Sequence, residues 1–136
     1  MNNLKTQEKG EVAQLKIELR AVEKGILISK PSRHESRYDC ILDDGQRLLR
    51  AQIKYANGKD KRSNGNIIVP LRKTHKNHTL RYLSSEIDVV LVYLPSVDKI
   101  LVLQKEQFHN KPSFYIRTER PLNNQKRYNW YEDFIW

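Results

Sequence analysis

The segment YDCILDDGQRLLRAQIK, residues 38–54, predicts the β-hairpin on which the fold rests. A run of strand-forming residues leads into two aspartates and a glycine, which are typical of a tight turn, and a second run returns from it. Side chains alternate along a strand, so every second apolar residue of the returning run is expected in the core. These residues are Leu49, Ala51 and Ile53. The opposite face ends in two polar side chains, Gln52 and Lys54.

An amphipathic helix is predicted ahead of the hairpin, over residues 7–24. Its apolar residues recur at spacings of three and four, and we expect this stripe to pack on the sheet. The stripe consists of Val12, Leu15, Leu19 and Val22. Gly25 is expected to end the helix because glycine tolerates positive φ. Residues 26–28 then indicate a short buried strand, which Pro31 stops.

The chain after the hairpin predicts further strands and a tail. Residues 56–66 form a loop rich in glycine and asparagine, and residues 67–69 a brief strand. Residues 87–94 are almost continuously apolar, as in a central strand, and residues 100–103 are expected to pair back on them. The aromatic segment 123–136 is expected to be a short helix or an interface segment.

These elements predict an α+β fold, a mixed β-sheet with an N-terminal helix packed against it. A length of 136 residues favours one compact domain, residues 1–136. Its core is expected to span about residues 7–104, followed by an aromatic C-terminal tail over about 105–136.

Positive charge is concentrated in one part of the chain. The formal net charge is +9, and residues 54–81 hold eight Lys or Arg against one acid. This focused excess favours nucleic acid as the partner. The single cysteine, Cys40, excludes an intrachain disulfide and suits a reducing cytoplasm. The sequence contains neither a secretory signal pattern nor an apolar run of roughly 20 residues that could span a bilayer.

The polar residues of the hairpin suit phosphodiester hydrolysis. That reaction needs a divalent metal held by hard oxygens, an activated water and neutralisation of developing negative charge. Asp39 lies on one strand, and Gln52 and Lys54 share a face of the next. Glu11, near the start of the helix, is expected to reach the same point, and the Ile53 carbonyl is a further metal oxygen.

This ordered set resembles the PD-(D/E)XK nuclease superfamily, and within it the small homing endonucleases of group I introns. Their pattern is Lys-Gly-Glu at the first helix, Tyr-Asp before a hairpin and Gln-x-Lys on the next strand. The chain has KGE at 9–11, YD at 38–39 and QIK at 52–54. Gln52 stands where most of the superfamily has an acid, so this site has one negative charge fewer.

The resemblance implies a restriction-endonuclease-like core and a site-specific double-strand DNA endonuclease of homing type. Asp39, the Ile53 carbonyl and Glu11 are expected to hold Mg²⁺, for which Mn²⁺ should substitute. Lys54 is expected to position the attacking water, and Gln52 to orient that water or complete the metal shell.

Because so small a chain must cut both DNA strands, we expect a homo-oligomer, either a dimer or a tetramer. The aromatic tail and the later apolar strands are candidates for its interface. The expected compartment is a bacterial cytoplasm.

The basic segment is expected to contact DNA. The segment is expected to form two basic loops. The first, residues 56–66, carries side chains able to read base edges, whereas residues 72–81 form the second and better suit contacts with phosphates. The expected DNA-binding residues are Lys59, Lys61, Arg62, Asn64, Arg72, Lys73, Lys76 and Arg81. The alternative is a solvated charged face.

Other interpretations remain open from the sequence. A restriction endonuclease or a Holliday-junction resolvase of the same fold would share this site, and a catalytically silent DNA-binding protein would share the charge. Asp43 and Asp44 are expected to serve the turn, and Asp88 to find a structural partner. A zinc site is not expected, because His75 and His78 have no second ligand pair beside them.

Overall fold

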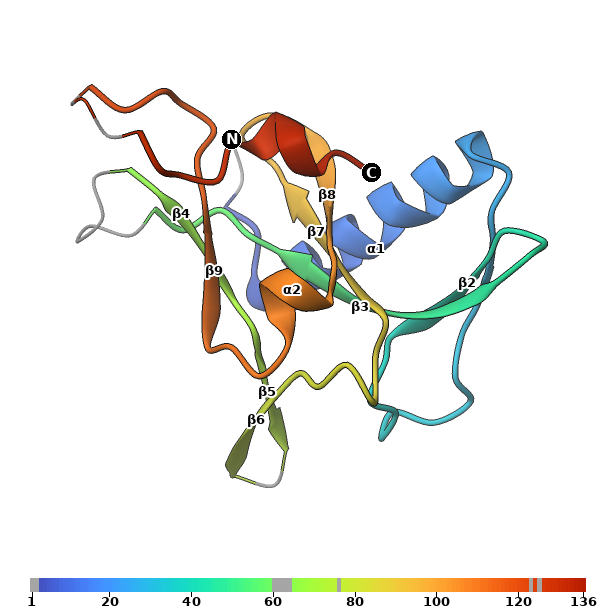
Figure 1. Ribbon diagram of the computed structural model, residues 1–136. Helices are drawn as coiled ribbons and strands as arrows, with labels where there is room; N and C mark the ends of the chain where they lie inside the picture. The colour runs from blue at the N-terminus through green and yellow to red at the C-terminus, as the bar shows by residue number, and fades with distance from the viewer. Residues whose placement is uncertain (1–2, 60–64, 76, 123, 125) are drawn as a thin grey trace.

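A mixed five-stranded sheet forms the centre of the molecule. In a computed structural model the described residues are 3–59, 65–75, 77–122, 124 and 126–136. The strands lie in the order β1 (Leu27–Ser29), β2 (Cys40–Asp43), β3 (Leu48–Tyr55), β7 (Val89–Leu94) and β8 (Lys99–Leu103) (Figure 1). Only β3 and β7 pair in parallel, and the other neighbours are antiparallel. The predicted α+β class and mixed sheet are confirmed.

The predicted hairpin is formed by β2 and β3, with Cys40 opposite Ala51. Its turn is stabilised as expected by the two aspartates. Asp43 Oδ1 accepts the Gly45 N–H at 2.9 Å, and Asp44 Oδ1 accepts the Arg47 N–H at 2.8 Å. Gly45 has a φ of +87°, a conformation that favours glycine.

Helix α1 (Thr6–Glu23) packs on one face of the sheet, but of the predicted stripe only Val12 packs against the core. The buried residues are Ala13, Ile17 and Ala21, which recur every four residues. Small alanine side chains let the helix approach the strands closely. Leu15, Leu19 and Val22 are instead 64%, 60% and 75% exposed. The spacing identified the helix correctly, but two apolar stripes share that spacing and the larger one faces solvent.

A second layer covers the opposite face of the sheet. Strand β4 (Ile67–Pro70) pairs antiparallel with β9 (Ser113–Ile116), and helix α2 (Lys105–Phe108) lies beside them. Phe108, Phe114 and Ile116 belong to the same buried cluster as residues of β7 and β8. The segment 105–136, expected to lie outside the core, therefore supplies part of it.

The basic segment after β4 is a β-hairpin, whereas it was expected to be a loop. Strands β5 (Arg72–His75) and β6 (His78–Arg81) pair antiparallel and project from the body of the molecule (Figure 1). The expectation was wrong because few of these residues are apolar, so the sequence shows no hydrophobic alternation. Asn77, with a φ of 65°, occupies the turn.

The aromatic tail folds back on the sheet. The 3-10 helix η1 (Tyr131–Phe134) confirms the expected short helix, and Phe134 meets Phe114 edge-on at 5.3 Å between ring centres. The Trp136 N–H donates to the Ile100 carbonyl at 2.9 Å. All six residues of β7 are buried within the protomer. Among the described residues, no helix has the length and apolar character needed to cross a membrane.

Arg50 and Asp88 join the two parallel strands at the start of their pairing. Arg50 donates from Nε and Nη2 to the Asp88 carboxylate at 3.0 and 3.1 Å. The backbone N–H of each residue also donates to the other, at 2.8 Å. These hydrogen bonds and the Arg50 charge hold the pKa of Asp88 below its usual range. The structural partner expected for Asp88 is thus confirmed.

We predict that Asp88→Asn lowers the free energy of unfolding by about 1–2 kcal/mol at pH 7, since a half-exposed charged hydrogen-bond pair is partly screened. A lowered folded-state pKa stabilises the protein above the unfolded pKa of about 3.9, and this contribution disappears as pH falls through the folded value. Urea unfolding at a series of pH values should therefore show the two proteins converging in acid.

Asp43→Asn is the matched control, because asparagine serves the same turn. Its stability should differ from wild type by less than about 0.5 kcal/mol. A difference between Asp88→Asn and wild type that does not depend on pH would contradict the assigned role of the pair.

Candidate functional site

The predicted site residues occupy one face and one edge of the central hairpin. Ala51 belongs to the cluster beneath α1 and Ile53 packs against it. Gln52 and Lys54 alternate with them and therefore point to the opposite face. Asp39 immediately precedes β2, beside β3.

Asp39 is exposed, and its carboxylate is fixed against β3. The Ile53 N–H donates to Asp39 Oδ2 at 2.8 Å, and the Asp39 N–H donates to the Ala51 carbonyl at the same distance. An exposed carboxylate with a fixed orientation is suited to binding a cation.

Gln52 has mainly a structural contact. The side chain is 3% exposed, and Nε2 donates to the Arg37 carbonyl. This bond ties the chain leading into Asp39 to the centre of the sheet. An acid at this position would bring its oxygens toward the Arg37 carbonyl oxygen, which explains in this chain why an amide suits the position.

Lys54 is held at the base of the β5–β6 hairpin. Its Nζ donates to the Arg72 carbonyl at 3.1 Å and lies 5.1 Å from the centre of the Tyr82 ring. Burial lowers the pKa of Lys54, the nearby Asp39 carboxylate opposes this, and the positive charges of Lys73 and Arg72 add to the lowering. Lys54 is thus close enough to Asp39 to interact electrostatically, although its ammonium turns toward the hairpin.

Tyr82 is a site residue that sequence reasoning missed. It is 6% exposed, packs against the Lys54 ammonium, and burial raises the pKa of its hydroxyl. The only sequence signal was an aromatic residue directly after the basic stretch, which does not indicate the distant Lys54.

Two carboxylates from different elements line one hollow, which we call the carboxylate hollow. Glu11 of α1 and Asp39 line it together with Ile53 and Lys73. The remaining lining residues are mostly polar: Gln7, Gly10, Gln14, Lys30, Pro31, Ser32, Arg33, His34, Ser36 and Tyr38. Glu11 and Asp39 therefore line the same hollow, whereas Gln52 and Lys54 do not line it.

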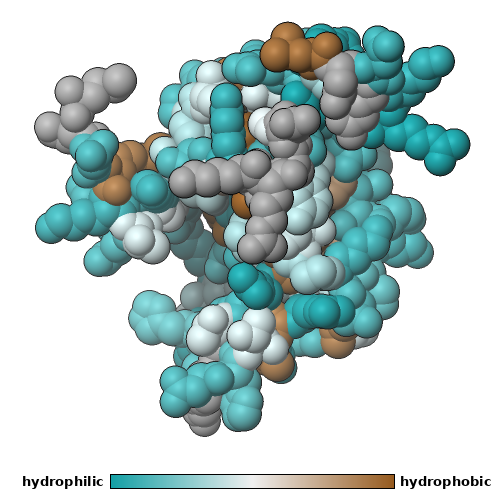
Figure 2. All heavy atoms as spheres, turned by 90° about the vertical axis from the view of Figure 1, so that its left-hand side faces the viewer, coloured by the Kyte–Doolittle hydropathy of each residue, from teal (hydrophilic) through white to brown (hydrophobic). Residues whose placement is uncertain are grey.

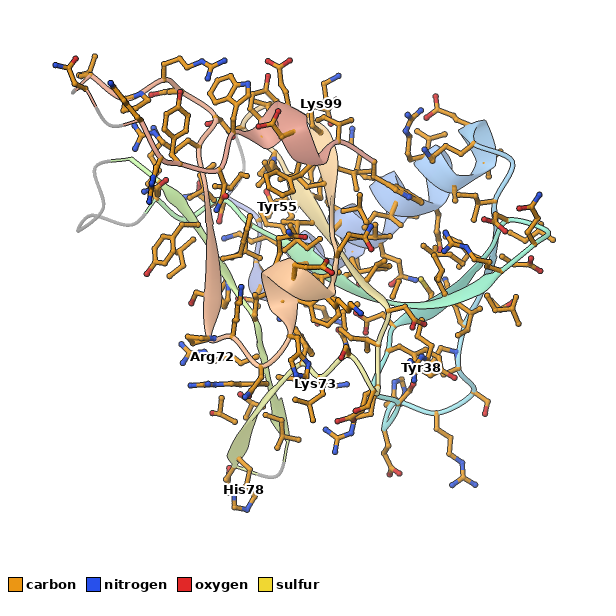
Figure 3. All side chains as sticks on the ribbon, viewed as in Figure 1. Tyr38, Tyr55, Arg72, Lys73, His78 and Lys99 are labelled. Atoms are coloured by element: carbon orange, nitrogen blue, oxygen red, sulfur yellow. The ribbon has the colours of Figure 1, made fainter. Side chains whose placement is uncertain are left out.

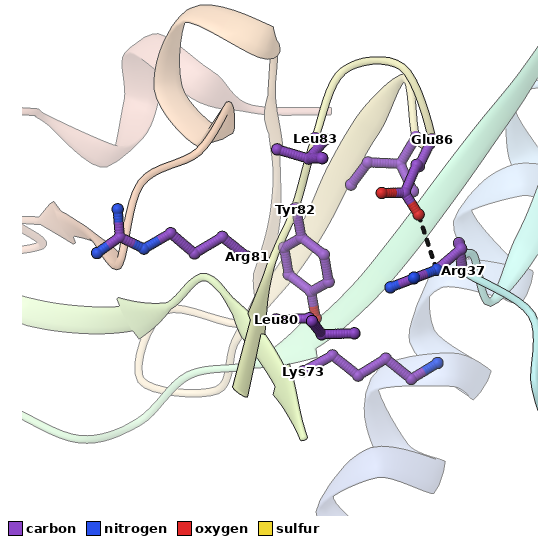
Figure 4. Close-up of a pocket in the computed structure, with 8 residues that line it drawn as sticks. Arg37, Lys73, Leu80, Arg81, Tyr82, Leu83 and Glu86 are labelled. Atoms are coloured by element: carbon purple, nitrogen blue, oxygen red, sulfur yellow. Dashed lines mark ion pairs between the residues drawn. The ribbon is translucent and has the colours of Figure 1, made fainter. Parts of the chain in front are cut away.

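Lys73 lines both this hollow and a second one. The second hollow is lined by Lys73, Tyr82 and the ion pair of Arg37 with Glu86, whose atoms lie 2.8 Å apart (Figure 4). Lys73 Nζ donates to the Ser36 carbonyl at 2.8 Å, so the hairpin is also fastened to the loop before Asp39. A cation at this point faces any anion that enters the carboxylate hollow.

The donor set suits a hard divalent cation held loosely. Among the described residues, no group of three or more His, Cys, Asp or Glu side chains gathers closely enough to enclose a metal. Two carboxylates in one open hollow match Mg²⁺, which is commonly held by one or two carboxylates and otherwise by water and phosphate oxygens. They do not match the tetrahedral nitrogen and sulfur set of structural zinc.

Half of the expected DNA-binding residues lie within the described part of the chain. Arg72 and Arg81 are paired at the base of the hairpin, Lys73 follows Arg72, and Figure 3 shows His78 at the far end. Lys59 forms an ion pair with Glu119 at 3.7 Å. The other four expected residues lie outside the described residues: Lys61, Arg62, Asn64 and Lys76.

Comparison with known proteins gives two findings. The PD-(D/E)XK endonuclease family model matches residues 4–136. Among solved structures, the bacterial homing endonuclease I-Ssp6803I matches with a TM-score of 0.78 and 21% sequence identity, over 97% of this chain and 89% of that one. At this identity the likeness shows the fold, which confirms the expected restriction-endonuclease-like core. A search of curated proteins found no match.

We predict that Gln52→Glu and Gln52→Met both destabilise the fold, by about 1–3 kcal/mol, because each leaves the Arg37 carbonyl without its donor. Only the loss of stability in Gln52→Glu should depend on pH. A buried carboxyl beside a carbonyl oxygen has a raised pKa, so the variant is relatively stable below the unfolded pKa of about 4.3 and loses stability as pH rises through the folded value.

Chemical unfolding at pH 4 and pH 8 in metal-free buffer measures this difference. Gln52→Met serves as the control, because its loss should be similar at both values. Equal losses for both variants across this range would contradict the hydrogen bond assigned to Gln52.

Proposed function

The chain belongs to the PD-(D/E)XK endonuclease family, and on that premise we propose that it is a magnesium-dependent endonuclease that makes site-specific double-strand cuts in DNA. The observation that carries the proposal is that Glu11 of α1 and Asp39 line one hollow, and that Asp39 stands beside β3, the strand that bears Lys54. Helix and sheet thus supply two hard-oxygen ligands beside a lysine, as phosphodiester hydrolysis requires.

The proposed roles combine the positions of the side chains with the order of the KGE, YD and QIK motifs. Asp39 and Glu11, with the Ile53 carbonyl, would hold Mg²⁺, for which Mn²⁺ would substitute. The bound ion supplies charge neutralisation at the phosphate and lowers the pKa of water. Lys54 positions the attacking water and offsets negative charge on the phosphate. Gln52, whose nitrogen is engaged by Arg37, acts through its side-chain oxygen, orienting that water or completing the metal shell.

The β5–β6 hairpin is proposed to bind duplex DNA. A two-stranded ribbon fits the major groove, and this one projects from the body with Arg72, Lys73 and Arg81 at its base (Figure 3). Because Lys54 donates to the Arg72 carbonyl, the ribbon also contacts the catalytic lysine directly. Binding of the ribbon to DNA is therefore expected to affect the position of Lys54.

We assign the biological role to homing, in a bacterial cytoplasm. The support is the fold shared with a bacterial homing endonuclease and the KGE, YD and QIK motifs. Cutting of linear duplex distinguishes this role from junction resolution, which needs a four-way substrate.

We propose that two copies act together, in a dimer or within a tetramer, so that each strand meets one active site. Strand β7 is buried within the protomer and cannot offer the contact first expected of it, whereas the tail keeps exposed residues, Ile135 among them. The exposed stripe of α1, Leu15, Leu19 and Val22, is the better candidate, and Ile135 extends it beside Leu19.

We predict that Asp39→Asn and Lys54→Ala each lower the rate of DNA cleavage by about 10²–10³-fold, because each removes charge stabilisation at the reacting phosphate. Glu11→Gln should cost about tenfold, since water can replace a single ligand. Nicking and linearisation of plasmid and phage DNA libraries with Mg²⁺ or Mn²⁺ measure these rates, and a chelator should abolish cleavage.

Asp44→Asn is the control for these variants, because it removes an acid from the same hairpin but from its turn. It should cut at the wild-type rate. Cleavage of four-way junctions but of no linear duplex would replace homing with junction resolution. No cleavage of any substrate by wild type would favour a silent DNA-binding protein.

We predict that the double variant Leu15→Glu/Leu19→Glu is folded but monomeric by analytical ultracentrifugation. Charges on the stripe oppose burial between copies, whereas neither residue contributes to the core. Linear product should fall relative to nicked circles. The control is Lys24→Glu, an exposed change near the end of the helix, and assembly equal to wild type in the double variant would exclude this interface.

A further inference from the structure

The loop between β9 and η1, residues 117–130, is fastened at its base. The Arg117 N–H donates to the Asn129 carbonyl at 2.8 Å, and the Tyr131 N–H donates to the Arg117 carbonyl at 3.0 Å. Asn129 Nδ2 also donates to the Tyr115 carbonyl at 2.8 Å. This segment, which we call the arm, therefore leaves the second layer and returns to it at one point.

One cation of the arm is held in place by aromatic rings. The Arg120 guanidinium carbon lies 3.8 Å from the centre of the Trp130 ring and 5.9 Å from that of Tyr128. Arg120 Nη1 also donates to the Tyr128 hydroxyl at 2.8 Å. Stacking restricts the side chain while leaving guanidinium edges able to donate to an anion, which reduces the entropy lost on binding.

The charge of the arm is strongly positive. It carries four basic residues, Arg117, Arg120, Lys126 and Arg127, and one acid, Glu119. Arg120, Lys126 and Arg127 are exposed to solvent, and Glu119 forms an ion pair with Lys59. Three exposed cations thus share one short loop.

The arm continues the basic surface of the hairpin. Strands β4 and β9 pair, and the Lys59–Glu119 ion pair joins Lys59, ahead of β4, to the arm. From β4 the chain leads directly into β5 and the hairpin. In Figure 1 the arm, β4 and the hairpin lie along one side of the molecule, and Figure 2 shows that side as largely hydrophilic.

We propose that the arm binds the phosphate backbone of duplex DNA that flanks the cleaved segment. The proposal rests on the proposed function, since it extends the DNA path beyond the active site. No described residue of the arm lines either hollow, so its contact is separate from the reacting phosphate. Arg120 covers one face of the Trp130 ring and blocks that face from stacking on an unpaired base, which favours backbone contact over binding of single strands.

The test compares Lys126→Gln/Arg127→Gln with wild type in binding to blunt, mixed-sequence duplexes of about one to four helical turns, by fluorescence anisotropy without divalent metal. On the longer duplexes the double variant should bind about three- to tenfold more weakly. Its salt dependence should lose about one unit of slope for each cation removed. The shortest duplex, which cannot reach both surfaces, should show a smaller loss, and cleavage at saturating DNA should keep its wild-type rate.

Three further variants sharpen the result. Lys99→Gln/Lys105→Gln removes the same charge from exposed positions outside the arm, and should reduce binding less at every length. Arg120→Lys keeps the charge but loses the planar stack, so its affinity for long duplex should fall between that of wild type and that of Arg120→Gln. Thermal melting of each variant establishes that it is folded.

The outcomes separate the two proposals. Binding of long duplex equal to wild type, or a loss matched by the Lys99/Lys105 control, overturns the role of the arm while leaving the nuclease intact. Wild type that binds duplex with the expected length dependence but cuts nothing retains the arm and removes the proposed function. Wild type that binds no duplex overturns both.

Discussion

The parallel pairing of β3 with β7 is the constraint on which the rest of the structure depends. It brings together strands separated by more than thirty residues and gives β3 a buried neighbour on each side. Arg50 and Asp88 fasten the two strands where their pairing begins, through side chains as well as backbone. Once β3 is fixed, alternation assigns Ala51 to the layer of α1 and Gln52 to the opposite layer.

That alternation also explains why the site is spread over both layers. Glu11 comes from the helix on one face, Lys54 points to the other, and Asp39 stands at the edge between them. Gln52 ties the loop before Asp39 to the sheet through the Arg37 carbonyl. The geometry of the proposed site therefore depends on how the helix, the sheet and this loop pack together.

The hairpin contributes to the site from outside the sheet. Lys73 donates to the Ser36 carbonyl beside the carboxylate hollow, and the Arg72 carbonyl accepts from Lys54. An element that is itself polar and exposed is thus fastened to the two segments that carry the proposed catalytic groups. This arrangement connects the ribbon proposed to bind DNA with the proposed catalytic residues through two hydrogen bonds.

The sequence by itself determined the local features of this protein: the helix, the central hairpin, the turn aspartates and the ordered motifs around Asp39 and Lys54. Periodicity, turn chemistry and motif order are local, so a single chain displays them. Only the tertiary structure decided which stripe of α1 is buried, that the basic segment pairs as a ribbon, and that Lys54 rests against Tyr82. These outcomes depend on side-chain volumes and contacts between distant segments, which no spacing along the chain records.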